Sequence, residues 1–381
     1  MSEDLQTIDY NQEANNVEQS DESKVHIDIP FDPNLIRIRQ DPFTLGQLID
    51  KIEHDEINFI TNFQRKADLW DAMKQSRLIE SVLLKLPLPS FYFDEVIREN
   101  PTTKENEYIW QVIDGLQRCS VLRNFVVKKN MHLTDLEFLT KYNGAPYDKL
   151  PRELQRRIMQ TPISVYVVEK GTPEDVKFNI FRRINTGGLI LTPQEIRHAL
   201  NQGVASEYVA RLAELKIFKE ATCGIIKTER MEDRDFVTRY ISFYLVPYID
   251  YKPDLDTFMS GAMRIIESSD MEKMKIDFEK SMRTASQIFA NDAFRKRKLK
   301  DAKRGPINKA LFEVLSVTFA KLNDDETKSL INNKELFINK FIKLNNDDTF
   351  LDSIGSGTGD RSRVIKRFSE IERIIKETIT K

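Results

Sequence analysis

The sequence predicts an α+β domain over residues 25–203, followed by an all-helical domain over residues 204–381. Three observations support this class. The chain has 381 residues, which is too long for one ordinary core of roughly 150 residues. Strand-like alternation occurs in the first half, whereas apolar residues beyond Gly203 recur at helical spacing. An apolar fraction of 40% with 23 phenylalanines supplies the side chains for an interior.

Residues 1–24 predict a disordered acidic tail. They hold seven acidic residues and one lysine, so this segment carries −6 within a chain of net charge −2, and the remainder carries +4. Such a tail is typical of a solubility segment. The alternative is that it shields a basic groove until nucleic acid displaces it. The tail has neither the basic start nor the apolar stretch of a secretion signal.

The α+β domain is expected to begin at an edge of its sheet. Residues 25–40 alternate between apolar and polar side chains, which predicts one edge strand or two short ones. Thr44 then starts a helical run through residue 57. A helix pair follows over residues 69–85, in which Ser76 is expected to cap the second helix.

Two strands, at 90–96 and 107–114, are expected to form a hairpin with a long loop. The second strand leads directly into Asp114-Gly115-Leu116-Gln117-Arg118, after which a helix begins. A third strand at 163–169 precedes a helix that starts at Thr172-Pro173, a hydroxyl cap followed by proline at the first position. The motif therefore lies at a strand-to-helix turn.

The helix after Pro173 is expected to end at Gly187-Gly188, and the next begins at Thr192, which has capping-box spacing from Glu195. The clearest helices of the second domain cover residues 234–246, 307–322 and 362–379.

The Asp114–Arg118 turn combines residue types that handle phosphate. Glycine lets the backbone approach a ligand, arginine offers a two-pronged donor to phosphate, and Asp114 could hold Mg²⁺ or act as a general base. The alternative is an ordinary turn with a surface arginine, because short motifs occur often by chance.

Two other segments offer anion-binding groups. Arg65, after Gln64, lies in a loop before a helix, and Arg183 and Asn185 stand beside the Gly187-Gly188 pair. Backbone N–H groups of the glycine turn and of Thr192 could cradle a phosphate. The alternatives are a solvated loop charge for Arg65 and a left-handed helix cap for the glycines.

The second domain contains a dense basic segment. Its seven basic residues against one acid suggest contact with a nucleic-acid backbone, and the alternative is a solvated helix face. The seven are Arg295, Lys296, Arg297, Lys298, Lys300, Lys303 and Arg304. A weaker basic group follows the glycine-rich loop at 355–359 and comprises Arg361, Arg363, Lys366 and Arg367.

The sequence disfavours a histidine- or cysteine-ligated metal centre, a disulfide framework and a membrane-spanning protein. The four histidines have no metal-ligand spacing, and the two cysteines stand alone, as expected for a reducing compartment such as the cytoplasm. No stretch approaches the ~20 consecutive apolar residues of a membrane span.

The order of these motifs resembles a known family. A Gln64-Arg65 loop, the segment 78–93, the Asp114–Arg118 turn and the segment 181–200 follow one another as in the ParB-like N-terminal domain of GmrSD-type restriction endonucleases. The usual signature there is Asp-Gly-Gln-Gln-Arg, and this chain has Leu116 in the third position. Segments 230–243, 305–315 and 350–368 are also similar to that family.

The resemblance implies a ParB/sulfiredoxin-like domain that binds and hydrolyses a nucleoside triphosphate, in proteins that attack modified phage DNA. The residues that match its motifs are Gln64 and Arg65 in the first box, Asp114, Gly115, Gln117 and Arg118 in the signature turn, and Arg183, Asn185, Gly187 and Gly188 in the third. Well-known members carry a His-Asn-His nuclease domain, for which this chain lacks the histidines. Either DNA cleavage is therefore expected to need a partner subunit, or this chain acts on DNA in another way.

Three hypotheses follow. In the first, Arg65, Arg118 and the Gly187-Gly188 turn hold the phosphates of a nucleoside triphosphate, while Asp114 and Gln117 position Mg²⁺ or water, and the basic segment contacts DNA. In the second, Asp114 acts on DNA without a nucleotide, either by nicking the strand or by releasing a modified base. Release of a base requires that it flip out of the duplex and stack on a nearby aromatic such as Phe63, Trp70 or Trp110. The third is a non-catalytic, nucleotide-sensing regulatory subunit. A homo-oligomer is compatible with all three.

Overall fold

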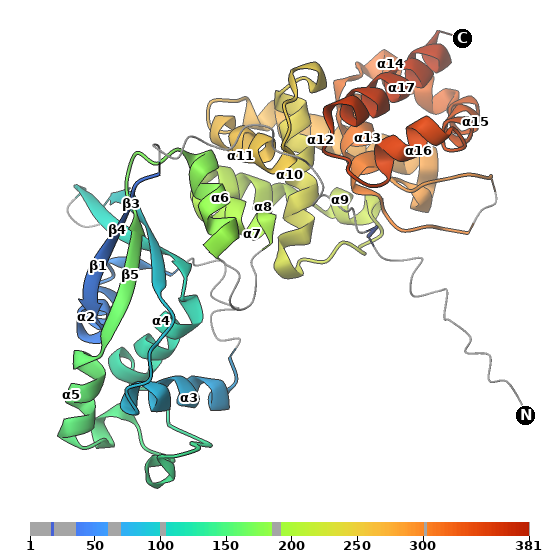
Figure 1. Ribbon diagram of the computed structural model, residues 1–381. Coiled ribbons are helices and arrows are strands. Elements are labelled where there is room, and N and C mark those ends of the chain that lie inside the picture. Colours follow the sequence, from blue (N-terminus) through green and yellow to red (C-terminus); the bar gives the residue numbers. More distant parts are fainter. Residues whose placement is uncertain are drawn as a thin grey trace, which may run out of the picture. The chain divides into compact units, whose positions relative to one another are not determined.

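The computed structural model describes residues 17–18, 36–59, 70–99, 104–184, 192–300 and 303–380 (Figure 1). The chain divides into two compact units. The N-terminal unit comprises residues 31–190, and the helical unit comprises residues 191–381 together with residues 1–30. The predicted class, α+β followed by helices, is confirmed.

The N-terminal unit is built on a five-stranded mixed sheet with the strand order β1-β5-β3-β4-β2. The strands are β1 (Ile38–Thr44), β2 (Ile57–Asn58), β3 (Phe91–Glu99), β4 (Asn106–Asp114) and β5 (Pro162–Val168). The pairs β1–β5 and β3–β4 are antiparallel, and the pairs β3–β5 and β2–β4 are parallel. β1 is an edge strand, but it covers residues 38–44, whereas the strand was predicted over residues 25–40, of which 25–35 lie outside the described residues. Ile57 lies in β2 and not in the preceding helix.

Five α-helices are described in this unit: α2 (Leu45–Glu53), α3 (Ala72–Leu83), α4 (Leu116–Leu122), α5 (Arg152–Gln160) and α6 (Glu174–Ile184). Thr44 begins α2 as predicted, because its hydroxyl and the Gln47 side chain form a reciprocal capping box. The predicted role of Ser76 is wrong. α3 is a single helix capped by Asp71, and the Ser76 hydroxyl bonds to the Ala72 carbonyl within it.

One face of the sheet supplies the core of this unit. Alternate residues of each strand point to that face, so Phe91 and Phe93 of β3 pack with Trp110 of β4 and with α2, α3 and α4. A buried ion pair ties α6 to the sheet. Lys177 and Asp94 are 6% and 2% exposed, and the Lys177 Nζ lies 2.9 Å from the Asp94 Oδ1.

The helical unit contains longer helices around an aromatic core. Its α-helices, in the described residues, are α7 (Pro193–Leu200), α8 (Val204–Glu214), α9 (Lys216–Ala221), α10 (Glu232–Leu245), α11 (Leu255–Ile265), α12 (Met271–Phe289), α13 (Lys309–Lys321), α14 (Asp324–Asn332), α15 (Lys334–Leu344), α16 (Asp348–Ile354) and α17 (Arg361–Ile379). α7 belongs to this unit, although the sequence pattern places the boundary after it, because Arg197 of α7 is bonded to Asp235 of α10.

A network of buried charges crosses the helical unit. Arg367 is fully buried and donates to Glu313 as well as to the carbonyls of Ser353 and Thr358, at 3.2 and 2.8 Å. Arg239 of α10 donates to the same glutamate. Arg367 therefore anchors the glycine-rich loop from inside and does not form a surface basic group with its neighbours in sequence.

No helix in the described part of the chain is both long and apolar enough to cross a bilayer.

Candidate functional site

The Asp114–Arg118 motif lies at the predicted turn between β4 and α4. Asp114 is the last residue of β4, and α4 begins at Leu116. Between them Gly115 has a φ of +100°, a left-handed conformation that favours glycine. A Cβ at this position would lie 2.8 Å from Cδ1 of Phe91, so the turn needs glycine for its conformation and for space.

Arg118 is held within the protein by contacts on several sides. Its Nη1 donates to the Pro89 carbonyl, and its Nη2 donates to the Ser90 carbonyl at 3.0 Å. The guanidinium also lies over the ring of Phe91, 4.4 Å from its centroid. With 9% of its side chain exposed, Arg118 fixes the start of β3 against the turn. Burial lowers the pKa of the guanidinium, and the Asp114 carboxylate opposes that shift.

Asp114 is the partly exposed carboxylate of the turn. Its Oδ2 accepts a hydrogen bond from Arg118 Nη2 at 3.0 Å, and 34% of its side chain is exposed. Because Arg118 is anchored to two backbone carbonyls, it sets the direction of the carboxylate. The arrangement presents a partly exposed acid that is held from behind by a buried cation.

The remaining residues of the turn differ in their surroundings. Gln117 is half-buried, and so is Leu116, which packs against the core of the N-terminal unit. That contact explains why an apolar residue fits where the signature has glutamine. Cys119 is fully buried, and burial raises the pKa of its thiol to about 12, so it remains protonated and is no nucleophile.

Sequence reasoning did not single out Arg123. This residue follows α4, in a π-helical turn (Arg123–Val127), and its guanidinium lies 4.2 Å from the ring centroid of Phe59. Its Nε is buried and has no hydrogen-bond partner in the described residues. The positive charges of Arg118 and Arg123 both act on the Cys119 thiol, so Arg123 brings a second cation to this region. Its spacing from Arg118 gave no signal, because only residues three or four apart face each other on a helix.

Several predicted phosphate-binding residues lie outside the described residues, namely Gln64, Arg65, Asn185, Gly187 and Gly188. The parallel pairing of β2 and β4 brings their carboxyl ends to the same edge of the sheet, and the Gln64-Arg65 segment follows β2 in the chain. Arg183 is exposed near the end of α6. The structure thus joins Asp114 directly to Arg118, and the convergence of Arg65 and Arg183 on this turn stays a prediction.

Thr192 forms the predicted capping box of α7. Its hydroxyl accepts from the Glu195 amide, and the Glu195 carboxylate accepts from the Thr192 amide at 2.7 Å. Glu195 also binds Arg230, whose carbonyl accepts from the Thr192 hydroxyl at 3.2 Å. These contacts give Thr192 a structural role, and a phosphate contact through its backbone stays a prediction.

The described residues of the basic segment (295–300 and 303–304) are irregular chain ahead of α13 and do not form a helix face. Arg295 is 2% exposed and donates to the Gly305 carbonyl, so its guanidinium lies inside the fold. Four other bases have acidic neighbours: Lys296 has Glu18, Arg297 and Arg304 have Asp292, and Lys300 has Glu335. Lys298 and Lys303 are exposed.

Trp110 is 6% exposed and packs against Phe43 and Phe93, so it offers no surface for a flipped base. No group of three or more His, Cys, Asp or Glu residues suited to a metal occurs among the described residues. Any Mg²⁺ at the turn would therefore depend on Asp114 and on the phosphates of a substrate.

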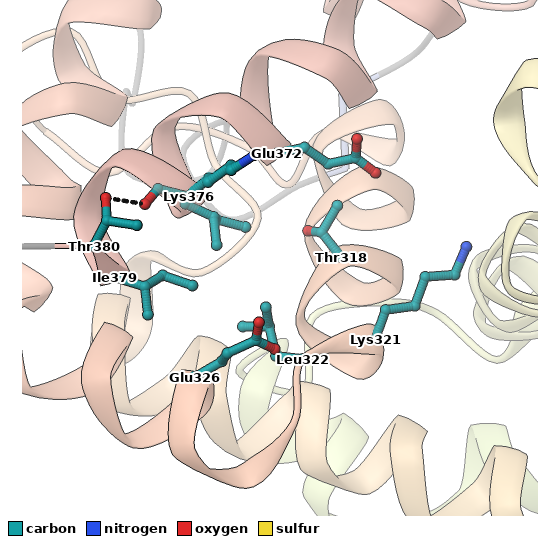
Figure 2. A pocket seen from close by; sticks show the side chains of 9 residues that line it. Thr318, Lys321, Leu322, Glu326, Glu372, Lys376, Ile379 and Thr380 are labelled. Carbon is teal, nitrogen blue, oxygen red and sulfur yellow. Dashed lines mark hydrogen bonds between the residues drawn. The ribbon is translucent and has the colours of Figure 1, made fainter.

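A pocket of about 490 Å³ lies in the helical unit, between α13, α14 and α17 (Figure 2). Thr318 and Leu322 line it beside Ile375 and Ile379, and Glu372 and Lys376 come from α17. No residue that the sequence marked as functional lines this pocket.

Comparison with known families identifies the part of the chain that carries the turn. Residues 45–201 match the family model of the GmrSD restriction endonuclease, N-terminal domain. A search of curated proteins found no significant match. The matched span includes the Asp114 turn and α7, in agreement with the order of motifs in the sequence. Residues 45–201 therefore belong to the N-terminal domain family of GmrSD restriction endonucleases.

Proposed function

We propose that this chain is an anti-phage defence protein that binds and hydrolyses a nucleoside triphosphate at the Asp114 turn and acts on phage DNA with modified bases. The family of residues 45–201 supports a restriction-type role with DNA as partner. The observation that carries the nucleotide site is the geometry of Asp114. Its carboxylate is partly exposed and is directed by a buried arginine that is anchored to two carbonyls.

In this proposal Asp114 is the reactive group and Arg118 is a positioning residue. One carboxylate oxygen of Asp114 is bonded to Arg118, and the other accepts a proton from the attacking water, as a general base does. Arg118 keeps the carboxylate in that direction, because three of its hydrogen bonds go to Pro89, Ser90 and Asp114.

The phosphates need other cations, since Arg118 is committed to the protein. We assign them to Arg65, Arg123 and Arg183, with the glycine turn at 187–188. Within the described residues, the positive charge of Arg123 acts on the Cys119 thiol, next to Arg118 in the chain. A guanidinium suits this task because it offers two parallel donors to phosphate oxygens.

A single carboxylate suits Mg²⁺, which proteins often hold through one or two carboxylates and the phosphates of the substrate. As an alternative to acting as the base, Asp114 would hold this ion, which would neutralise phosphate charge. The exposed bases Lys298 and Lys303 are the proposed contacts with the DNA backbone in the helical unit.

The test is nucleotide hydrolysis by the purified full chain, alone and with duplex DNA of one sequence that either carries modified bases or lacks them. The expected result is hydrolysis that the modified duplex stimulates. Absence of nucleotide binding, together with nicks or abasic sites in the modified DNA, would instead favour a hydrolase that acts on DNA directly. Nucleotide binding without turnover would favour the regulatory subunit.

A further inference from the structure

Two residues of the acidic N-terminal segment dock beside the basic segment. Val17 forms a parallel β-bridge with Ile307, and the Glu18 amide donates to the Ile307 carbonyl at 2.7 Å. Ile307 also bridges Arg295 in antiparallel fashion, and Val17 packs against the core of the helical unit. Val17 and Glu18 therefore add as a short strand to this part of the unit, a common mode of peptide recognition.

The Glu18 carboxylate is held by two donors. Its Oε1 accepts from Lys296 Nζ at 2.6 Å, and its Oε2 accepts from Asn308 Nδ2 at 3.0 Å. Asn308 is 3% exposed and is fixed in place, because its Oδ1 caps α13 through the Leu311 amide and its Nδ2 also donates to the Ile354 carbonyl. Donors that are already fixed bind an anion with little loss of conformational entropy.

Charge complementarity supports a specific role for this contact. The segment of residues 1–24 carries −6, and Glu18 of this segment meets the basic segment at Lys296, which is partly exposed and follows the buried Arg295. A phosphate group presents the same chemistry to Lys296 as the Glu18 carboxylate, namely anionic oxygens. The two ligands therefore compete for one lysine.

We propose that Val17 and Glu18 form an autoinhibitory strap, which occupies Lys296 of the basic segment and which the backbone of duplex DNA displaces. The inference rests on the proposed function in that DNA is the competing ligand. The docking of the strap is a property of the free chain and is measured separately. Release of the strap makes Lys296 available for a phosphate contact.

The test compares Glu18→Ala with Glu13→Ala in the full chain. Both variants remove one negative charge from the same acidic segment, but Glu18→Ala alone removes the contacts with Lys296 and Asn308. Hydrogen exchange measures protection of the Glu18 amide, and titration of a duplex at several salt concentrations measures DNA affinity. One added phosphate contact steepens the slope of log affinity against log salt by about 0.9 and raises affinity about tenfold at low salt.

In hydrogen exchange, we expect the amide of residue 18 to be protected in the wild type and in Glu13→Ala and to lose protection in Glu18→Ala. In DNA titration, we expect tighter and more salt-dependent binding by Glu18→Ala alone. Rapid exchange of that amide in the wild type would overturn the docking. Equal DNA affinity of the two variants, with the strap released in one, would overturn autoinhibition and leave the proposed function intact. If no variant binds DNA, both the DNA partner and the strap's role fail.

Discussion

Replacing Gly115 by alanine tests the geometry of the Asp114 turn. Gly115 has a φ of +100°, and its new Cβ would lie 2.8 Å from Cδ1 of Phe91 and 3.3 Å from Nη2 of Arg118. The left-handed conformation costs about 1–2 kcal/mol for a residue with a Cβ. Overpacking against a buried ring adds roughly 1–3 kcal/mol. We therefore expect Gly115→Ala to lower the free energy of unfolding of the N-terminal unit by about 2–5 kcal/mol.

Gly144→Ala is the matched control. Gly144 also has a positive φ, +83°, but a Cβ there meets no atom within 4 Å. It should show the conformational cost alone, about 1–2 kcal/mol. Both tryptophans of the chain, Trp70 and Trp110, lie in the N-terminal unit, so tryptophan fluorescence during urea unfolding follows that unit selectively. Equal losses in the two variants would refute the close approach of Phe91 to the turn.

Two further predictions concern the helical unit, with unfolding followed by far-ultraviolet circular dichroism. Burial and the charge of Arg234 lower the pKa of His198 to about 4, so the unfolded chain binds the proton more readily, and stability is lost as the pH falls from about 6.5 toward 4. Between pH 7 and pH 5 the wild type should therefore lose about 2 kcal/mol more than His198→Gln, and parallel losses would argue against a buried neutral imidazole. Glu313→Gln leaves the buried guanidiniums of Arg239 and Arg367 without their shared carboxylate and should cost about 3–5 kcal/mol. Glu279→Gln, which breaks the partly exposed pair with Arg283, should cost under about 1 kcal/mol, and a similar loss in both variants would contradict the buried network.

The parts of the fold that follow from local rules could be predicted from the sequence. Short runs rich in aromatic and β-branched residues indicated β3, β4 and β5, and capping patterns identified the starts of α2 and α7 at Thr44 and Thr192. Ser76 was misassigned because Asp71, earlier in the sequence, caps the helix, so the serine lies in its interior. β2 was missed because a two-residue strand is defined by its pairing with β4, which leaves no periodic signal.

The candidate site was predictable in its position but not in its chemistry. The turn at Asp114 follows from a strand that leads into a helix through glycine. That Arg118 is buried depends on Pro89, Ser90 and Phe91, which are distant in sequence. The burial of Arg295 was not predictable either, because its hydrogen bond to the Gly305 carbonyl leaves no signal in a run of basic residues. Sequence patterns identify charged side chains, but tertiary contacts determine which of them remain available to a ligand.

The most direct test of the central claim compares three proteins for hydrolysis of a nucleoside triphosphate: the wild type, Asp114→Asn and the control Asp148→Asn. Asp148 is an exposed carboxylate of the same unit, paired with Lys129, and controls for the loss of one charge. Unfolding monitored by tryptophan fluorescence verifies that each variant is folded. We predict that the wild type and Asp148→Asn hydrolyse the nucleotide and that folded Asp114→Asn loses activity by a factor on the order of 10²–10⁴, as expected for loss of a general base. Undiminished hydrolysis by folded Asp114→Asn, or none by the wild type, would contradict the assignment of Asp114 as the reactive group.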